Sequence, residues 1–561
     1  MSGAPLTPAS ALPLRDVPPQ ARRRRFPAWT LLAPLLAALI AAPLLAVLVS
    51  AAVPAGAVWR HIASTTLPEM LANSALLALL VGLMVASAGA LSAWLVTACR
   101  FPGRGVLEVA LLLPMAMPAY VCGYAYTWLL DVAGPVQAGL RALTGLRWGQ
   151  YWFPEIRSLP GAALMLAMVL YPYVYLLCRA AFQQQSVCLL EASRTLGHSL
   201  AHSFVHLALP LARPAIVGGV ALALMETLAD FGTVQHFAVR TFTTGIYEAW
   251  FGLGDRGAAS QLAACLMGLV AALLVLEHVS RGGRRFHPTT NRHPPLRPVP
   301  LHGWKAGAAM VACAMPVVLG FLVPAGTLFA LMLQVGDPLE PDRFLPFARN
   351  SLVLAGLTAL VAVALAGLLA WAARLHATAP QRLAVRVAGL GYAVPGSVIA
   401  VGTLVPLGLF DNALDGWMRA RFGISTGLLL SGGIAALVFA YLVRFLAVAL
   451  SAVESGLARI RPSLRDAARV LGARPGGAVW RVELPLARGS LLTGFLLVFV
   501  DTMKELPATL IVRPFDFDTL AVRVHSLAAD ERLAEASTAA LLIVVAGLLP
   551  VLALTRAMRR G

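Results

Sequence analysis

The chain has 561 residues, of which 59% are hydrophobic and only 12% are charged. A soluble domain carries roughly 25% charged residues, so this composition excludes an ordinary soluble protein and indicates a membrane protein. Lys and Arg number 44 against 26 Asp and Glu, which gives a net charge of +18. Because basic residues collect in the cytoplasmic loops of membrane proteins, and no basic cluster here is interleaved with aromatic residues, we expect no nucleic-acid binding.

The N-terminal region has a basic stretch, Arg22 to Arg25, followed by a long apolar run. The run is well beyond the about 7–15 apolar residues of a cleaved secretory signal. We therefore predict a basic cytoplasmic tail over residues 1–27 and a retained first membrane helix.

Twelve apolar runs are each close to the about 20 residues that a membrane-spanning helix needs. The predicted spans are 29–53, 71–98, 106–130, 160–181, 211–230, 259–280, 306–333, 349–373, 384–410, 424–451, 488–512 and 535–555. The expected fold class is an all-α polytopic membrane protein with about twelve transmembrane helices in two tandem six-helix units. The units cover residues 28–281 and 304–561, and the segment 282–303, rich in Arg, His and Pro, is predicted to be a flexible cytoplasmic linker.

The orientation follows from the distribution of Lys and Arg. When the N-terminus starts in the cytoplasm and the sides alternate at each span, the cytoplasmic segments hold roughly twice as many basic residues as the external ones. Acidic residues show the opposite bias. Arg444 is assigned in this count to a position near a helix end. We therefore expect both termini in the cytoplasm.

An internal repeat lies in the long cytoplasmic loop before the fifth span of each unit. A segment with the pattern acidic-Ala-x-Arg-x-x-Gly, followed thirteen residues later by Pro, occurs twice at an offset of 275 residues. Its first copy contains Glu191, Ala192, Arg194, Gly197 and Pro210, and its second contains Asp466, Ala467, Arg469, Gly472 and Pro485. With an even number of spans in each unit, the repeat is parallel, with a pseudo-two-fold axis along the membrane normal.

Each copy of the repeated segment predicts a short helix, a turn and a new membrane helix. The glycine can end the short helix in a left-handed cap, and the proline suits the first turn of the next helix. The product is a rigid element on the cytoplasmic face, which can transmit the movement of an attached soluble subunit to the membrane helices.

The repeated segment resembles the EAA loop of binding-protein-dependent ATP-binding-cassette importers. Ser193 replaces the second Ala of the pattern in the first copy, and Asp466 replaces Glu in the second. The resemblance implies that both segments are coupling helices that dock on an ATPase. The chain has no Gly-Lys-Ser/Thr motif, because its two lysines follow Trp304 and Met503. We therefore expect ATP and Mg to bind to a separate ATPase homodimer, with no cofactor bound by this chain.

The fifth span of each unit contains ionisable residues. The first has Glu226 and Asp230, and the second has Asp501, Lys504 and Glu505. The i, i+4 spacing places each acidic pair on one helix face. Two interpretations stay open: an acidic lining of a cation pathway, or a structural network in which Lys504 pairs with Asp501 or Glu505.

The whole chain resembles the fused ferric-iron permeases of the same importer superfamily. The resemblance covers nearly all of residues 28–556, including 225–234, 242–247 and 501–509. It implies import of Fe³⁺ across a bacterial inner membrane, with delivery by a periplasmic binding protein. The external segments after the fifth spans are expected to contact that protein. The expected contact residues are Phe242, Thr243, Thr244 and Tyr247.

Other functions also fit the sequence. Fused thiamine and aminoethylphosphonate permeases share the architecture, and an ion-coupled secondary transporter is the alternative of a different class. No catalytic motif points to an enzyme. Three histidines recur at four-residue spacing: His198, His202 and His206. This spacing suits either a metal site or a polar face toward the ATPase, and the sequence assigns no residue as a metal ligand.

Overall fold

The computed structural model describes residues 29–53, 56–184, 193, 195–281, 298–335, 341–375, 378–473 and 475–560, and this part of the chain is almost entirely helical. The first repeat contains α1 (Trp29–Ala51), α2 (Ala57–Thr65), α3 (Leu67–Ala98), α4 (Arg104–Ala110), α5 (Ala119–Leu130), α6 (Pro135–Thr144), α7 (Leu159–Gln184), α9 (Leu200–Ser203), α10 (Leu209–Ala229), α11 (Gly232–His236), α12 (Phe242–Tyr247) and α13 (Arg256–Arg281). The second repeat contains α14 (Trp304–Val317), α15 (Val323–Val335), α16 (Pro341–Leu375), α17 (Ala379–Ala388), α18 (Gly396–Phe422), α19 (Ile434–Ala458), α20 (Pro462–Val470), α21 (Pro475–Ala478), α22 (Leu484–Met503), α23 (Pro507–Val512), α24 (Leu520–Ala529) and α25 (Leu533–Arg560). Short 3₁₀ or π turns and two strands complete the set: η1 (Leu113–Ala116), η2 (Phe204–Ala208), η3 (Glu248–Gly252), η4 (Val318–Leu322), η5 (Gly391–Ala393), η6 (Val479–Glu483), β1 (Cys99–Arg100) and β2 (Val299–Pro300).

The number of membrane spans agrees with the prediction of about twelve. Within the described residues, eleven helices are long and apolar enough to cross a membrane. A further pair, Arg104–Ala116 and Ala119–Thr144, is bent by 92° and makes twelve if it counts as one span. The chain is therefore an all-α polytopic membrane protein.

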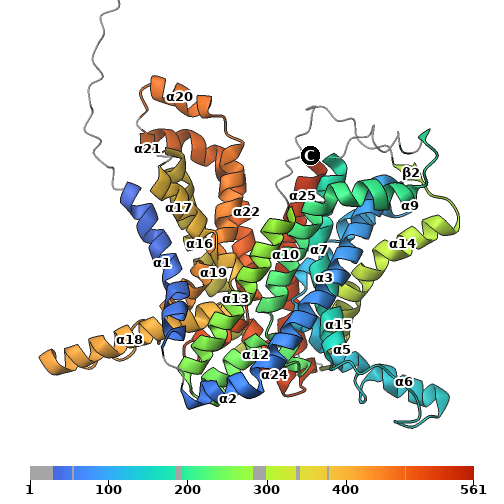
Figure 1. Ribbon diagram of the computed structural model, residues 1–561, viewed down its shortest axis with the longest axis horizontal. Helices are drawn as coiled ribbons and strands as arrows, with labels where there is room; N and C mark the ends of the chain where they lie inside the picture. The colour runs from blue at the N-terminus through green and yellow to red at the C-terminus, as the bar shows by residue number, and fades with distance from the viewer. Residues whose placement is uncertain are drawn as a thin grey trace, which may run out of the picture.

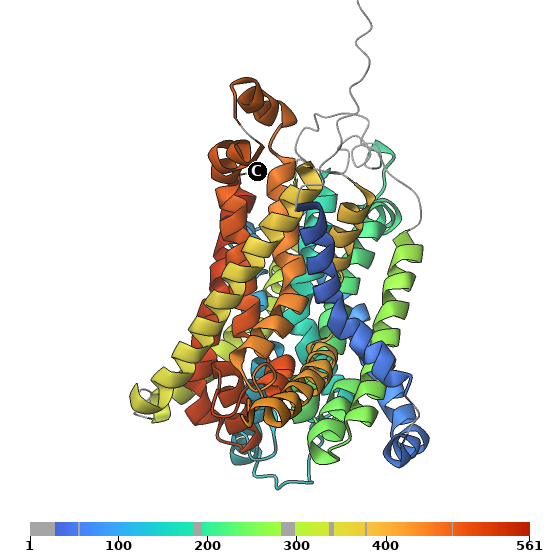
Figure 2. The same ribbon diagram turned by 90° about the vertical axis from the view of Figure 1, so that its left-hand side faces the viewer.

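Most of the long helices run side by side between two ends of the bundle, whereas α18 extends sideways from it (Figure 1). The start of α1, the end of α25 and the short helices α9 and α20 all lie at the end drawn uppermost, which we call the upper end (Figures 1 and 2). The helices α2, α12 and α24 lie at the opposite, lower end. The first and last described helices therefore share an end with both repeated segments.

The third span of each repeat is broken by a proline. Residues 106–130 are predicted as one span, but the chain turns at Pro118, whose extended ψ of 138° lets α5 begin in a new direction. In the second repeat, Pro395 has a ψ of 142° and separates η5 from α18 in the same way. Continuous spans at 106–130 and 384–410 are therefore wrong, because proline removes a backbone donor and its ring excludes the preceding turn of helix.

The predicted linker is in part a fixed element. Residues 282–297 lie outside the described residues, but Val299 and Pro300 pair in parallel with Cys99 and Arg100. The N–H of Leu301 also donates to the Arg100 carbonyl at 2.9 Å. The prediction of a flexible linker through residue 303 is wrong at this end, because backbone hydrogen bonds fix it against the end of α3.

The two hydrophobic cores do not coincide with the two repeats. The first core is built mainly from first-repeat helices together with α14, α15 and α25. The second is built mainly from α16 to α19 together with α1 and α13. Each repeat therefore packs its first helix against the other repeat: α1 contacts α17 and α18, while α15 contacts α5.

The contact between α3 and α7 depends on a glycine. A Cβ added at Gly89 would lie 2.6 Å from the Val174 Cβ and 2.9 Å from the Tyr175 backbone nitrogen. At Gly82, in the same helix, the nearest atom would be 3.6 Å away. We expect Gly89→Ala to lower the free energy of unfolding by about 1–3 kcal/mol, since a packed interface must shift. Gly82→Ala should be neutral or stabilising, because alanine favours helix. Thermal unfolding in lipid nanodiscs measures both, and equal behaviour of the two variants would contradict the packing argument.

Candidate coupling segments and translocation cavity

The second repeated segment forms the helix and glycine turn that its sequence predicts. Asp466, Ala467 and Arg469 lie in α20, which starts at a proline. Gly472 follows with a φ of +88°, a left-handed conformation that glycine adopts without strain. The N–H of Ala473 donates to the Ala468 carbonyl at 3.0 Å, which closes the helix in a Schellman-type cap.

The first repeated segment has the same turn. Glu191, Ala192 and Arg194 lie outside the described residues, but Gly197 has a φ of +81°. The N–H of His198 donates to the Ser193 carbonyl at 3.1 Å, which is the bond of the other copy shifted by 275 residues. The two repeated segments therefore share the same glycine turn and the same backbone hydrogen bond across it.

Each coupling segment continues directly into a long membrane helix. Residues Leu200–Ala229 form one helical stretch of 30 residues, and Gly476–Met503 form one of 28. At 1.5 Å per residue each stretch is roughly 40–45 Å long. Pro210 and Pro485 are the second residues of α10 and α22, after the π turns η2 and η6. A displacement at the upper end can thus reach the opposite end of the same helix.

Among the described residues of the coupling segments, several large apolar side chains are exposed. Val470 and Leu471 are 87% and 88% exposed at the end of α20. Leu196 and Trp480 are similarly exposed beside Gly197 and in η6. A cluster of exposed apolar residues at a water-facing end is typical of a protein–protein contact. This surface is where a soluble subunit can dock.

The other ends of these two helices meet at an open cavity of about 780 Å³ between the repeats. Its wall comes from α7, α10, α19, α22 and the proline turn before α5. Six ionisable side chains line it: Glu226, Asp230, Arg444, Asp501, Lys504 and Glu505. All five of the predicted pathway residues therefore gather at one site. Four carboxylates face two cations there, which leaves an excess of acidic groups.

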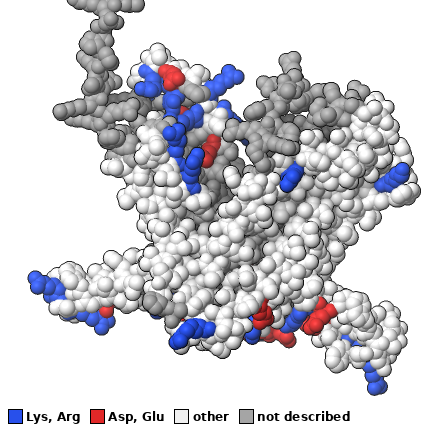
Figure 3. All heavy atoms as spheres, in the orientation of Figure 1, with Lys and Arg blue, Asp and Glu red and all other residues white. Residues whose placement is uncertain are grey.

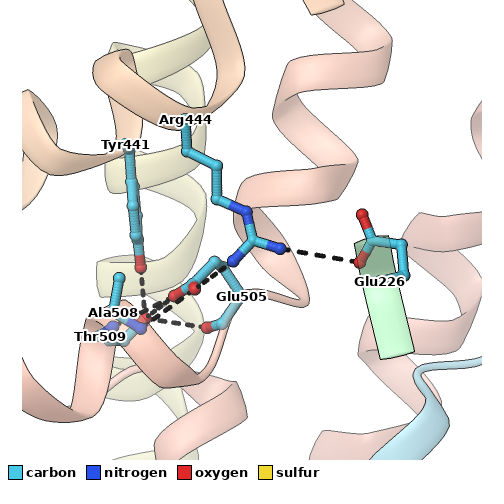
Figure 4. A network of polar contacts seen from close by, with 6 residues as sticks. All are labelled: Glu226, Tyr441, Arg444, Glu505, Ala508 and Thr509. Carbon is cyan, nitrogen blue, oxygen red and sulfur yellow. Dashed lines mark hydrogen bonds and ion pairs between the residues drawn. The ribbon is translucent and has the colours of Figure 1, made fainter. Parts of the chain in front are cut away.

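Arg444 joins the two repeats across this cavity (Figure 4). It projects from α19, and its Nη1 lies 3.1 Å from the Glu505 Oε1 of the same repeat. Its Nη2 lies 3.6 Å from the Glu226 Oε2 of the first repeat. Only 8% of the Arg444 side chain and 2% of the Glu505 side chain are exposed. The assignment of Arg444 to a helix end is wrong: it lies inside α19, where two carboxylates offset the cost of its burial.

Asp230 and Glu505 each hold the start of a short helix. The Asp230 carboxylate accepts hydrogen bonds from the backbone N–H groups of Thr233 and Val234 at 3.0 and 3.1 Å. The Glu505 carboxylate accepts from those of Ala508 and Thr509 at 3.0 and 3.1 Å. These carboxylates satisfy backbone donors that the first turn of a helix leaves free. Both carboxylates therefore cap helices, which is a structural role other than the predicted pairing with Lys504, and Lys504 pairs with Asp501 instead.

Glu226 and Asp501 occupy equivalent positions one turn earlier in α10 and α22. Glu226 contacts Arg444, and the Asp501 Oδ1 lies 2.9 Å from the Lys504 Nζ. Each is thus paired with one cation and keeps part of its surface in the cavity.

A second cavity of about 670 Å³ lies at the lower end, beside α5 and α24. Arg157 lies in its wall, 3.0 Å from Asp131 and 3.4 Å from Glu531. His236 lines it too, and burial, together with the charge of Arg157, lowers the pKa of His236 to about 4. The imidazole is therefore neutral at physiological pH, and the charges of this cavity come from the arginine and the carboxylates.

The predicted binding-protein contacts lie in and next to the capped helix α12. Phe242 and Thr243 are buried, and the Thr243 hydroxyl donates to the Asp230 carbonyl at 2.7 Å. Neither side chain is exposed for a direct contact in this structure, because Phe242 packs in the second core and Thr243 ties α12 to Asp230. Thr244 and Tyr247 are partly exposed, so a contact there stays a prediction.

The three histidines of the first coupling segment stack on one another. The ring centroids of His198 and His202 are 4.3 Å apart, and those of His202 and His206 are 4.1 Å apart. Across the described ranges, no group of three His, Cys, Asp or Glu side chains has an arrangement that could hold a metal ion. The histidines are an aromatic stack on the helix surface in this structure.

Comparison with known proteins gives matches over both repeats. The family model described as "Binding-protein-dependent transport system inner membrane component" matches residues 86–279 and 362–561. An Fe(3+)-transport system permease protein of Haemophilus influenzae is 27% identical over 493 residues, which cover 87% of this chain and 90% of the relative.

Two shorter relatives each match about a third of the chain. A molybdenum transport system permease protein of Escherichia coli K12 is 29% identical over 194 residues, or 34% of this chain and 81% of the relative. A sulfate transport system permease protein of the same organism is 32% identical over 206 residues, or 35% of this chain and 71% of the relative. The family model covers well over half of the chain and falls once on each repeat. The chain therefore belongs to the family of binding-protein-dependent transport system inner membrane components, and it is a transport permease subunit rather than an enzyme.

Proposed function

We propose that this permease imports ferric iron. The observation that carries the proposal is the likeness to an Fe(3+) permease through 87% of the chain, across both repeats. The molybdenum and sulfate permeases match about a third of it. The excess of carboxylates over cations in the central cavity supports a cationic cargo, since ionisable groups in membrane helices commonly line ion pathways.

The two ends of the bundle suggest where the other subunits bind. An ATPase homodimer on the cytoplasmic face would place one copy under each coupling segment, and ATP and Mg would bind there. A periplasmic binding protein would deliver iron at the lower end. Both termini would then lie in the cytoplasm of a bacterium, with the permease in its inner membrane. Lys and Arg side chains near α20 at the upper end support this orientation, and the basic side chains at the lower end lie together with acidic ones (Figure 3).

Uptake by the reconstituted transporter tests the proposal. Proteoliposomes containing the permease and its ATPase, with the binding protein outside, should accumulate radiolabelled Fe³⁺ only when ATP is inside. Sulfate, molybdate and thiamine should neither accumulate nor compete. An ATPase that lacks its catalytic glutamate is the control. Uptake of sulfate or molybdate instead of iron would overturn the substrate, and flux without any ATPase would indicate an ion-coupled secondary transporter.

A further inference from the structure

Two arms extend sideways from the lower end of the bundle (Figure 1). The first arm is α6 with the return segment 145–158, and the second is residues 409–422 of α18 with the return segment 423–433. The two arms point in opposite directions, away from the central cavity. They lie at equivalent places in the two repeats, since both follow the proline turn of the third span.

The helices of both arms end in the same way. Gly145 and Gly423 have left-handed φ values of +71° and +67°. Their N–H groups donate to the carbonyls of Arg141 and Arg419, four residues earlier, at 2.9 and 3.1 Å. This is the simple left-handed cap with one hydrogen bond. Both repeats therefore stop the arm helix just after an arginine and turn the chain back.

The return segment of the second arm is fixed to its helix by two carboxylates. Asp411 accepts hydrogen bonds from the N–H groups of Leu430 and Ser431 at 3.1 and 2.7 Å. Asp415 accepts from those of Thr426 and Gly427 at 2.8 and 3.0 Å. These bonds satisfy backbone donors in a segment without secondary structure. The second arm therefore has a defined structure in which the return segment is hydrogen-bonded to the helix.

A tyrosine fixes the return segment of the first arm. The Tyr151 hydroxyl donates to the Gln137 Oε1 at 2.7 Å, and Arg141 donates to the same hydroxyl at 3.1 Å. Different side chains therefore achieve the same result in the two repeats, which indicates that the shape of the arms matters.

Both arms expose large apolar side chains. Leu143 and Trp152 on the first arm are 89% and 87% exposed. The other exposed large apolar residues are Val136, Leu146 and Trp148 on the first arm, and Leu409, Phe410, Trp417, Phe422, Ile424, Leu428, Leu429 and Leu430 on the second. An apolar surface of this kind is unfavourable in water, so something covers it.

Basic side chains accompany these apolar residues. Arg141 and Arg147 belong to the first arm, and Arg419 and Arg421 to the second. Figure 3 shows blue side chains at the outer tip of each arm. An interfacial helix combines an apolar face with Lys and Arg, and tryptophan is enriched at the membrane–water boundary.

We propose that the two arms lie in the headgroup region of the lipid leaflet at the lower end and bind anionic phospholipids there. The aromatic and aliphatic side chains enter the boundary of the acyl chains, and the four arginines contact phosphate groups. Arg141 and Arg419 do so with the guanidinium nitrogens that are not used by Tyr151 and by the Asp415 ion pair. The arms continue the lipid-facing flank of the bundle, because α18 packs against the later part of α1 at Pro43 and Val47, where Leu45 and Leu48 are exposed. A binding protein seated over the cavity does not fit as the occupant, because the arms point away from it on both sides. Arms anchored in lipid on opposite sides of the bundle would keep its lower end from tilting in the membrane while the coupling segments move.

Spin labels on the arms test this placement. Leu143→Cys and Leu409→Cys, each in the full-length permease in nanodiscs of phosphatidylethanolamine and phosphatidylglycerol, should collide more often with oxygen than with a water-soluble nickel chelate. Asp530→Cys, at an exposed turn of the lower end, is the aqueous control and should show the reverse. The signal of the unsubstituted protein corrects for native cysteines. Arm labels that favour the nickel chelate, or that become protected only when the binding protein is added, would overturn the proposal.

The preference for anionic lipid is tested by the four arginines together. Replacing Arg141, Arg147, Arg419 and Arg421 by Gln should abolish the rise in unfolding temperature that phosphatidylglycerol gives to the wild type over phosphatidylcholine. Replacement of the same four by Lys keeps the charges and should restore most of the rise. A glutamine variant with an unchanged response to phosphatidylglycerol would show that the arginines do not bind the headgroups.

Discussion

Arg444→Met is expected to destabilise the permease by about 3–5 kcal/mol. The substitution keeps the volume of the side chain but removes the cation between Glu505 and Glu226, and an unpaired buried charge costs this much. Apparent unfolding temperature in nanodiscs and the yield of folded protein measure the loss. We also expect Fe³⁺ uptake to fall, because the bridge fixes the cavity wall of one repeat against the other.

A double-mutant cycle separates the ion pair from general packing. Arg444→Met combined with Glu505→Gln should lose clearly less than the sum of the two single losses, because the pair then leaves no uncompensated charge between them. Arg444→Lys keeps the charge but not the two-nitrogen geometry, so it should fall between wild type and Arg444→Met. Strictly additive losses would show that Arg444 stabilises the protein by packing alone.

The double variant Gly197→Val, Gly472→Val is expected to uncouple ATP hydrolysis from uptake. Both glycines have a left-handed backbone, which costs an L-residue roughly 1–2 kcal/mol, and more for a β-branched one. Nothing lies within 4 Å of a Cβ added at either position, so the effect comes from the backbone and not from a clash. The helix before each glycine should change direction. The assembled transporter should then hydrolyse ATP while iron uptake drops at least about tenfold, which corresponds to 1.4 kcal/mol.

Gly476→Val is the matched control for this experiment. Gly476 lies in α21 of the same coupling segment, a Cβ there would also meet open space, and its φ is not positive. The control variant should keep uptake near that of the wild type. Normal transport by the Gly197→Val, Gly472→Val protein would contradict the coupling role of the two turns.

Local patterns in the sequence were sufficient to predict most of the spans and the coupling turns, but not the breaks at Pro118 and Pro395. Apolar runs of the required length determine the membrane helices, and the acidic-Ala-x-Arg-x-x-Gly pattern contains both a helix and its left-handed stop. The repeat offset of 275 residues also places the hydrogen bonds of His198 and Ala473 in register. These features depend on neighbours within a few residues of each other.

Features that depend on distant residues were missed. Arg444 is an isolated cation in an apolar run, and only folding brings it to Glu226 of the other repeat. One missed feature is local: Asp230 and Glu505 cap the short helices that follow them. The sequence signal for this capping was a threonine three residues after Asp230 and another four residues after Glu505. The burial of Phe242 and Thr243 depends on the packing of α12, which a threonine-rich segment does not reveal.

The first helix of each repeat packs on the other repeat, and this packing limits how the two halves of such a protein can be recombined with those of a relative. Because α1 packs on α17 and α18, and α15 on α5, neither half of the chain carries a complete core of its own. A chimaera that joins the first half of this protein to the second half of a relative must therefore match two foreign interfaces at once. The parts that separate when a passage opens should likewise be composite bodies, each assembled from both ancestral copies.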